Sequence, residues 1–420
     1  MKKTSHTFTR RQFLAASTAS IFLPSIIPGS AVGLNGKLSA NSRLITMVIG
    51  VGSRGPDLQS GAMRDPNFQV IGVCDCNKKH LIERGQNRIN NYYKNKDCLI
   101  FSHYEDILAR KDVDVIINAT PDHWHTKITV EACIAGKDVY CEKPLTLTPM
   151  ESHQIVRAAR MYNRVVTGGS QRVMEDYGYI APIIRSGAIG HVKEAYVTVG
   201  NPPKECYLPA EKEPEYLDWD RWQGQAPVAA YHPERCSGSY GGGWRNYSEY
   251  GNGFLADWGA HKFGGTLYIM GLDDQEPVEI LPPESPENPN QGCCAIYKNG
   301  FKLYHRGAKD ICFVGSERNF NHGDDRNKVK PLHSVDIRRY HGGAKNIMAD
   351  FAYCVRNRLR PFQDVAYAAN TATLCQLMNI CYKVNRPLKW DSEKCVFIGD
   401  EQATKMVLRP QRFPYVIPVI

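Results

Sequence analysis

Two hydrophobic patterns alternate between residues 44 and 167. Short, continuous apolar runs are typical of strands buried on both faces of a parallel sheet, and the longer segments between them have the period of helices. The strand-like runs cover residues 44–49, 70–74, 99–101, 113–119, 139–143 and 164–167, and the helix-like segments cover 78–92, 104–110, 126–135 and 149–162. This alternation predicts an α/β fold that begins with a Rossmann domain, a doubly wound parallel sheet.

The pattern changes after residue 170. A strand-like run at 194–199 precedes a stretch without clear period, which is followed by strand-like runs at 292–297, 302–305 and 311–314 and by helix-like segments at 342–357 and 364–384. This order predicts a C-terminal α+β domain with an open mixed sheet. A chain of 420 residues also exceeds one ordinary domain. We therefore expect a Rossmann domain at 43–170 and a substrate and oligomerisation domain at 171–420.

Residues 1–40 have the features of a leader. Thr9-Arg10-Arg11-Gln12-Phe13-Leu14 is followed by an apolar run up to Ile27 that is too short, and too interrupted by proline, to span a bilayer. The paired arginines predict a twin-arginine export signal, a periplasmic location and no membrane span once the signal is removed. The alternative is a disordered basic N-terminus on a cytoplasmic protein.

The net charge of +9 does not indicate a nucleic-acid partner. Lysine and arginine after the leader alternate with acidic residues, as on an ordinary solvated surface. Most of the 14 cysteines lie inside apolar runs, which favours buried thiols over a disulfide framework. Their spacing does not fit a zinc site, and we predict no metal centre.

The segment Gly50-Val51-Gly52-Ser53-Arg54-Gly55 follows the first strand directly. G-x-G-x-x-G is a weak signal alone, but here it opens a helix near Pro56, and a second buried strand ends in Asp75, 20 residues beyond the last glycine. This order is the dinucleotide fingerprint, in which glycines let the backbone approach a pyrophosphate and the acid binds the ribose hydroxyls. A carboxylate there repels a 2′-phosphate, so NAD is favoured, although Lys78 and Lys79 leave NADP open.

Three further motifs stand where predicted strands end. Pro144 cannot extend a ladder, so the strand that ends in Glu142-Lys143 stops at the carboxyl edge of the sheet, where open α/β sheets bind ligands. Thr120-Pro121-Asp122-His123-Trp124-His125 follows the preceding strand, and we expect a loop over the cofactor rather than a metal site, because no further ligand lies at useful spacing. Gly168-Gly169-Ser170-Gln171-Arg172 follows the next strand.

These motifs together resemble the glucose-fructose oxidoreductase and inositol dehydrogenase (Gfo/Idh/MocA) family. The resemblance covers nearly the whole chain after the leader. It implies an NAD(P)-dependent oxidoreductase that transfers a hydride between a nicotinamide cofactor and a hydroxyl carbon of a sugar, glycoside or polyol, with Lys143 beside the reacting hydroxyl. The expected cofactor-binding residues are Gly50, Gly52, Ser53, Arg54, Gly55, Asp75, Thr120, Pro121, Trp124, His125, Glu142, Lys143 and Gln171.

Asp257 and His261 are four positions apart at the start of a predicted helix, so both lie on one face. Oxidising an alcohol needs a group that takes the hydroxyl proton, and a histidine suits that role. Asp257 would orient the ring, stabilise the imidazolium or contact the substrate. The resemblance implies that Lys143, Asp257 and His261 are the catalytic residues.

The irregular stretch before this helix is rich in tryptophan, tyrosine and arginine. Aromatic rings stack on the C–H faces of sugars and arginines bind hydroxyls, which predicts a carbohydrate cleft. The alternative is that the rings pack the loop against the sheet. The expected substrate-binding residues are Arg172, Trp219, Trp222, Trp244, Arg245, Tyr250, Asp257 and His261, with His341 as a lesser candidate.

Three functions fit these features. The first is a sugar or polyol dehydrogenase, and the second is a glycosidase that oxidises a sugar transiently and eliminates the aglycone, as in glycoside hydrolase family 109. The third is a binding protein without activity, which would have no need of the three catalytic residues. Because free nicotinamide is a cytoplasmic resource, an exported enzyme should keep its NAD tightly bound. We also expect a small-molecule carbohydrate substrate and a homo-oligomer.

Overall fold

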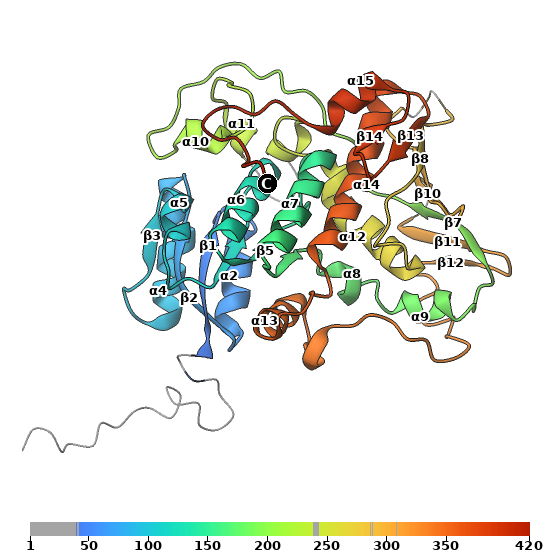
Figure 1. Ribbon diagram of the computed structural model, residues 1–420, viewed down its shortest axis with the longest axis horizontal. Helices are drawn as coiled ribbons and strands as arrows, with labels where there is room; N and C mark the ends of the chain where they lie inside the picture. The colour runs from blue at the N-terminus through green and yellow to red at the C-terminus, as the bar shows by residue number, and fades with distance from the viewer. Residues whose placement is uncertain (1–38, 40–41, 238–242, 286, 288, 308) are drawn as a thin grey trace, which may run out of the picture. The chain divides into compact units, whose positions relative to one another are not determined.

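The computed structural model describes residues 39 and 42–420 except 238–242, 286, 288 and 308. The predicted twin-arginine signal therefore lies outside the described residues. Residues Leu44–Ile420 form one compact unit that contains two sheets (Figure 1). Among the described residues, no helix combines the length and the apolar character that crossing a membrane requires.

The first sheet is parallel throughout and has the strand order β3-β2-β1-β4-β5-β6. Strands β4 and β5 are buried at every position, which explains the apolar runs Val115–Ile117 and Val139–Cys141 within them. The order reverses between β1 and β4, and ligands of such sheets bind at the carboxyl ends of the strands at this reversal. The predicted Rossmann sheet is confirmed. Its strands are β1 Leu44–Ile49, β2 Phe68–Cys74, β3 Leu99–Phe101, β4 Val115–Asn118, β5 Asp138–Cys141 and β6 Val166–Gly168.

The connections between these strands are mostly helical, as predicted. The segment after β2 is divided by a π-helical turn that contains Gly85, where a side chain would lie 2.7 Å from Val73. The helices are α2 Gly55–Arg64, α3 Lys78–His80, η3 Leu81–Gln86, α4 Asn87–Tyr93, α5 Tyr104–Leu108, α6 Asp122–Ile134 and α7 Pro149–Met161.

One prediction in this region is wrong. The segment 120–125 is not a loop before a helix at residue 126, because α6 already begins at Asp122. Pro121 stands at the N-cap, and the main-chain N–H of Trp124 donates to its carbonyl oxygen. An acid in the first turn also suits the positive end of the helix dipole.

The second sheet is mixed, with the order β12-β11-β7-β10-β9-β8-β13-β14. Strand β10 runs parallel to β7, and its other partner, β9, is antiparallel. Helices α9 Ile180–Arg185, α12 Gly253–Met270 and α14 Val365–Val384 contribute to its core, which confirms the predicted open sheet with flanking helices. The strands are β7 Val192–Val197, β8 Glu279–Leu281, β9 Cys294–Ile296, β10 Lys302–His305, β11 Ile311–Gly315, β12 Asn319–Asn321, β13 Leu388–Asp391 and β14 Val396–Phe397.

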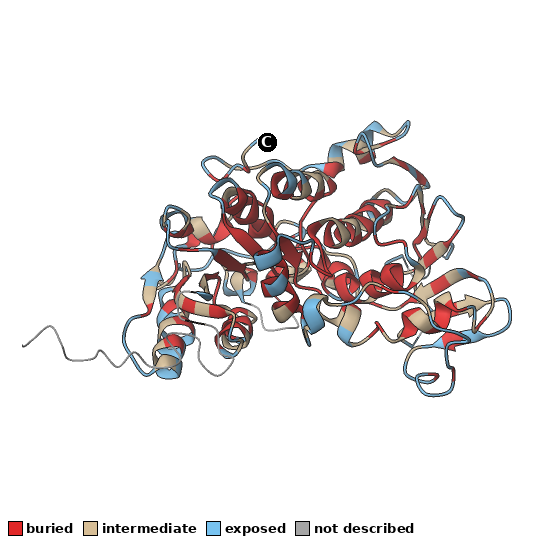
Figure 2. Ribbon diagram, turned by 60° about the horizontal axis from the view of Figure 1, so that its bottom comes forward, coloured by how far each residue is buried: buried red, intermediate tan, exposed pale blue. Residues whose placement is uncertain are grey.

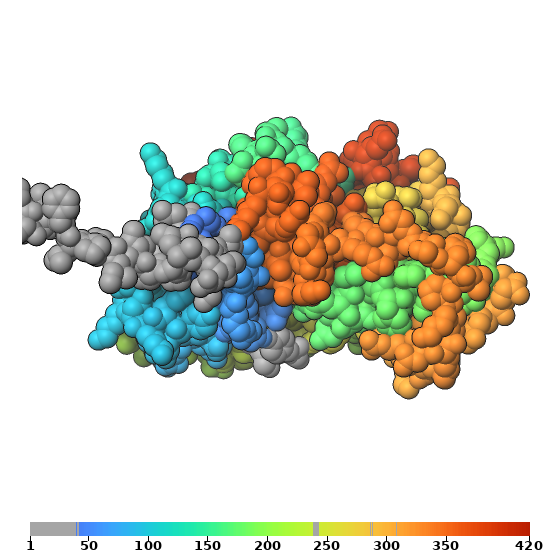
Figure 3. All heavy atoms as spheres, turned by 90° about the horizontal axis from the view of Figure 1, so that it is seen from below, coloured from blue at the N-terminus to red at the C-terminus, as the bar shows by residue number. Residues whose placement is uncertain are grey.

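Helices α7, α12 and α14 lie between the two sheets (Figure 1), and the residues there are largely buried (Figure 2). Helix α13 Ile347–Asn357 comes late in the chain but packs against the first sheet. Its Phe351 contacts Phe68 on β2 and Tyr140 on β5. Seen from below, the orange surface of the later part of the chain lies beside blue residues from its beginning (Figure 3). All 14 cysteines carry free thiols, 11 of them buried, as predicted.

The remaining elements are short. They are α8 Arg172–Glu175, α10 Trp219–Gln223, α11 Pro233–Cys236, η4 Gly243–Asn246, η5 His341–Gly343, α15 Glu401–Thr404 and η6 Lys405–Val407.

Candidate active site

A cavity of about 770 Å³ opens where β1, β2, β4 and β5 end. Its first wall is made by the residues that follow these strands, including Gly50, Asp75, Thr120 and Lys143. Its second wall comes from η4, α12 and the irregular stretch before them. The strand order places this cavity at the reversal of the first sheet, where a dinucleotide is expected.

The glycine loop has the space that a pyrophosphate needs. Gly50 has φ +85° and lies so close to Ala119 that a Cβ would be 2.7 Å from its carbonyl carbon. Gly55 packs on Gly50, where a Cβ would lie 2.1 Å from the carbonyl oxygen. Gly52, by contrast, lines the cavity, and a Cβ on it would meet nothing within 4 Å. These positions fit the fingerprint, because two glycines allow close packing and the third leaves its surroundings free for a ligand.

Asp75 closes the other end of this loop. Its carboxylate accepts hydrogen bonds from the main-chain N–H of Val51 and of Asn77, both at 2.8 Å, and it lines the cavity. Burial raises the pKa of Asp75, and the two N–H donors oppose this effect. A carboxylate held in this way is placed to accept the hydroxyls of a ribose.

Lys143 follows β5 and reaches Asp257, the fifth residue of α12. Its Nζ lies 2.6 Å from Oδ1 of Asp257 and 3.3 Å from the carbonyl oxygen of the same residue. Arg245 shares that carboxylate, with Nε 3.3 Å from Oδ1. Asp257 is only 6% exposed, so one buried carboxylate compensates two cations in the cavity wall.

His261 lies one helical turn beyond Asp257 and also lines the cavity. It is 4% exposed, and its Nδ1 has no hydrogen-bond partner among the described residues. Burial lowers the pKa of His261 well below its usual value, and the positive charges of Lys143 and Arg172 add to the effect. The imidazole is therefore neutral and can accept a proton.

The structure gives Asp257 a role that the sequence did not suggest. Its carboxylate pairs with Lys143 and Arg245, and within the described part of the chain it makes no ion pair with the ring of His261. Asp257 therefore positions the lysine rather than the imidazole.

Two histidines of the segment 120–125 hold the wall together. His125 places Nδ1 2.7 Å from the carbonyl oxygen of Pro144 and Nε2 2.8 Å from that of Thr120, so it ties the ends of β4 and β5. His123 and Trp124 both reach the carbonyl oxygen of Trp222, at 2.9 and 3.1 Å. His125 does not line the cavity, whereas Trp124 does.

Most of the predicted site residues meet in this cavity. The exceptions are Gly55, His125, Trp219 and Tyr250, together with the lesser candidate His341. Trp219 and Tyr250 are buried in a cluster with Trp222 and Trp244, in which the rings of Trp219 and Trp222 stack at 5.1 Å. Trp219 and Tyr250 therefore pack the irregular stretch, as the alternative to a carbohydrate cleft predicted, and do not face the cavity.

Among the cavity residues that were not predicted from the sequence, Trp258 and Asp122 lie closest to the proposed chemistry. Trp258 is 37% exposed beside His261, and Arg172 lies over its ring at 5.2 Å. Its position directly after Asp257 was a signal, because such a ring would lie next to the predicted catalytic residues. Asp122 lies in the opposite wall, and nothing in its local sequence distinguishes it from an ordinary first-turn acid.

Residues 214–237, which we call the cover segment, close the cavity on the side of Asp75. Tyr216 and Asp218 join the loop after β2: the Tyr216 carbonyl accepts from Lys78 N–H at 2.8 Å, and Asp218 N–H donates to the Cys76 carbonyl at 3.1 Å. Tyr216, Leu217, Arg221, Trp222 and Tyr231 face the cavity.

Besides the contacts of His123 and Trp124 with Trp222, the cover segment is attached to α5 and to residues 409–416. Arg221 Nη1 lies 2.9 Å from a carboxylate oxygen of Glu105 on α5. Residues 409–416 hold it from outside, since Arg412 pairs with Asp220 and donates to the Gly224 carbonyl at 3.1 Å, and the Tyr415 hydroxyl donates to Asp220 at 2.7 Å.

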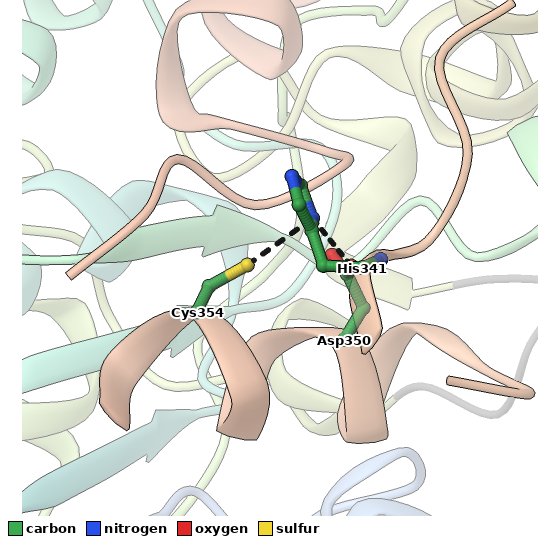
Figure 4. Close-up of side chains that lie close together, drawn as sticks. All are labelled: His341, Asp350 and Cys354. Carbon is green, nitrogen blue, oxygen red and sulfur yellow. Dashed lines mark hydrogen bonds and ion pairs between the residues drawn. The ribbon is translucent and has the colours of Figure 1, made fainter. Parts of the chain in front are cut away.

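His341 lies outside the cavity, in a cluster with Asp350 and Cys354 (Figure 4). Its Nδ1 is 2.9 Å from Asp350 Oδ1 and 3.3 Å from Cys354 Sγ. Asp350 also accepts the main-chain N–H groups of His341 and Phe362, at 2.6 and 2.7 Å. Burial raises the pKa of Cys354 to about 12, so the thiol is protonated. The cluster thus ties η5 and the chain after α13 together, away from the predicted substrate.

Comparison with known proteins agrees with this geometry. Residues 45–170 match the oxidoreductase family NAD-binding Rossmann fold, and residues 201–417 match the C-terminal alpha/beta domain of the same family. The chain belongs to the Gfo/Idh/MocA oxidoreductase family. The family resemblance that the motifs indicated is therefore confirmed, and with it an NAD-binding Rossmann domain.

Members of the Gfo/Idh/MocA family with similar sequences have different activities. The chain is 26% identical over 336 residues to glycosyl hydrolase family 109 protein 2 of Shewanella sp. (strain ANA-3), a match that covers 74% of this chain but 65% of the relative. It is 27% identical over 202 residues to inositol 2-dehydrogenase of Salmonella typhimurium, covering 45% of this chain and 58% of the relative. These matches span less than two thirds of either relative.

The fold is shared with a solved oxidoreductase. Aldose-aldose oxidoreductase from Caulobacter crescentus, crystallised with glycerol, superposes with a TM-score of 0.57 at 15% identity, covering 83% of this chain and all of the other.

Proposed function

We propose that the protein is an NAD-dependent oxidoreductase that acts on a hydroxyl carbon of a sugar, glycoside or polyol. One observation carries the proposal: the charged Lys143, the neutral His261 and the glycine loop with Asp75 line the same cavity. A dinucleotide-binding protein without activity would have no need of the lysine and the histidine.

The roles follow from the contacts. Lys143 is held in place by Asp257 and polarises the substrate oxygen with its positive charge. His261 is neutral and takes the hydroxyl proton during oxidation, or returns it during reduction. The nicotinamide ring, when bound, supplies or accepts the hydride. Trp258 offers an exposed ring in the same wall against which the C–H face of a sugar can stack.

NAD is the proposed cofactor because Asp75 would repel a 2′-phosphate. Lys78 and Lys79 were the reason to consider NADP as an alternative cofactor. They do not line the cavity, and the ammonium of Lys79 lies 3.9 Å from the ring centre of Tyr216. Arg84 does line the cavity, but its guanidinium already donates to the Gly52 carbonyl at 3.2 Å.

We propose further that the cofactor is resident. The cover segment lies over the side of the cavity that Asp75 forms, and its attachments to α5, to the loop after β2 and to residues 409–416 would have to open for a dinucleotide to leave. A resident NAD also suits export by the twin-arginine route, which carries folded proteins; export, a periplasmic location and a homo-oligomer remain predictions.

A glycosidase that oxidises, eliminates and reduces is the second candidate, because the match to the family 109 protein spans 336 residues. The test is to incubate the purified protein with a panel of sugars and nitrophenyl glycosides while recording both nicotinamide absorbance and released aglycone. Redox change without cleavage supports the dehydrogenase, and cleavage without net redox change supports the glycosidase. If neither occurs, the binding-protein alternative is the better account.

A further inference from the structure

Asp122 is a buried carboxyl with an unused oxygen. It is 2% exposed, and Oδ1 has no hydrogen-bond partner among the described residues. Its Oδ2 lies against the backbone of Gly251, where a Cβ would be 3.4 Å away. Buried polar atoms are nearly always satisfied, so a carboxyl oxygen without a partner in a cavity wall calls for an explanation.

The groups that face Asp122 come from three elements. Lys143 follows β5, Arg245 lies on η4 and Asp257 lies on α12, and all three act on its charge. The thiol of Cys141 on β5 is also close enough for the charge of Asp122 to act on it. Lys143 and Arg245 pair with Asp257, and neither forms an ion pair with Asp122 in the part of the chain that the structure describes.

Two cations and two carboxyl groups therefore meet across the cavity here, and of the two carboxyls only Asp257 forms ion pairs with the cations among the described residues. Asp122 accepts a hydrogen bond from the main-chain N–H of Asn252. Burial raises the pKa of Asp122 to about 7, while the cations Arg245 and Lys143 and this N–H oppose the shift and Asp257 adds to it. Both forms of the carboxyl are present near neutral pH. Once ionised, Asp122 is a second anion that attracts the same two cations, Arg245 and Lys143.

We propose that Asp122 is a positioning residue whose protonation state decides which carboxylate holds Lys143. The neutral carboxyl leaves Lys143 and Arg245 on Asp257, which is the arrangement in the structure. The ionised form, after releasing one proton to solvent, competes with Asp257 and draws the cations away from it. The inference rests on the oxidoreductase proposal, because Lys143 is the group through which Asp122 acts.

The test uses Asp122→Asn, which has the same shape and stays neutral, and Asp106→Asn, at an exposed position on α5, as a matched control. The first measurement is the pH dependence of turnover, with a substrate from the panel above. Wild type should lose turnover as the pH rises through about 7, up to tenfold per unit, with KM little changed. Asp122→Asn should keep the turnover that wild type has at low pH and should not lose it as the pH rises. The control Asp106→Asn should lose turnover as wild type does.

The second measurement needs no substrate and follows the melting temperature between about pH 5 and 8. The pKa of Asp122 is higher in the folded protein than in an unfolded chain, so its stabilising contribution is complete at low pH and is lost as the pH rises towards 7. Wild type should therefore lose stability relative to Asp122→Asn, and the control should follow wild type. If Asp122→Asn does not fold, Asp122→Ser, which also lacks the carboxyl, takes its place.

The outcomes separate the two proposals. A difference in melting temperature that is the same at every pH overturns the titration of Asp122. If turnover of Asp122→Asn still falls as the pH rises through about 7, Asp122 does not act on Lys143, and the oxidoreductase proposal stands. A wild type that turns over no substrate overturns the oxidoreductase proposal and the positioning role with it.

Discussion

Nζ of Lys143 lies 2.6 Å from Oδ1 of Asp257, and this ion pair joins the residues after β5 to the N-terminal half of α12. The first sheet and the helix of the second half thus meet at a charged contact inside the cavity. Because His261 follows on the same helix, the contact also fixes the distance between the cation and the neutral base.

We expect Lys143→Met and His261→Ala each to reduce turnover about 10²- to 10⁴-fold, the usual contribution of proton transfer and charge stabilisation. The amount of NAD released by denaturing the purified variants should stay near that of wild type. Lys193→Met and His191→Ala, which change exposed residues outside the cavity, are the matched controls. Near-normal turnover in either test variant would show that the residue is not part of the chemistry.

Asp75→Asn should raise the affinity for NADP relative to NAD about tenfold, because it removes the charge that repels a 2′-phosphate and keeps an acceptor for a main-chain N–H. Competition between the two dinucleotides for protein stripped of cofactor measures the ratio. Asp106→Asn serves as the control for the loss of one charge near the cavity. An unchanged ratio would mean that Asp75 does not face the ribose.

Arg221→Glu should release NAD about fivefold faster than wild type, since the loss of an ion pair of this kind is worth roughly 1 kcal/mol. The variant places a negative charge against Glu105 and loosens the cover segment from α5. Release is followed by diluting the loaded protein into an enzyme that consumes free NAD. The double variant Arg221→Glu with Glu105→Arg should restore slow release, and Lys394→Glu on the outer surface should have no effect. Equal rates in all variants would show that the cover segment does not retain the cofactor.

Stability should fall in acid, in part because of His123. Burial lowers the pKa of His123 to about 3, below its value in an unfolded chain, so its contribution is complete above about pH 6.5 and is lost as the pH falls. By about pH 4.5 the loss should reach roughly 2 to 3 kcal/mol. His123→Gln should show a shallower fall of the free energy of unfolding with pH, measured by urea denaturation. His191→Gln, an exposed control, should keep the slope of wild type.

The sheets were predictable because their strands are buried on one or both faces and are separated by glycine, proline and helical periods. At position 122 the sequence pattern does not distinguish a helix start from a loop. A proline followed by an acid marks a helix start as well as a loop, and we had expected the loop. The importance of Asp122 depends on Arg245 and Asp257, which reach it only in the folded protein.

The aromatic stretch shows the same limit for binding residues. Tryptophan is common both in sugar-binding clefts and in small cores, and composition does not separate them. In the structure Trp219 and Tyr250 are buried among their neighbours, while Trp258, which has no aromatic residue beside it in sequence, is exposed in the cavity.

The attachment of the cover segment to residues 409–416 sets an order of assembly. Both sheets, the glycine loop and the cover segment are synthesised before Arg412 and Tyr415, so the cover segment gains its contacts at Asp220 only when these two residues emerge. Cofactor binding would then be easiest during biosynthesis, before the contacts of Arg412 and Tyr415 with Asp220 fix the cover segment.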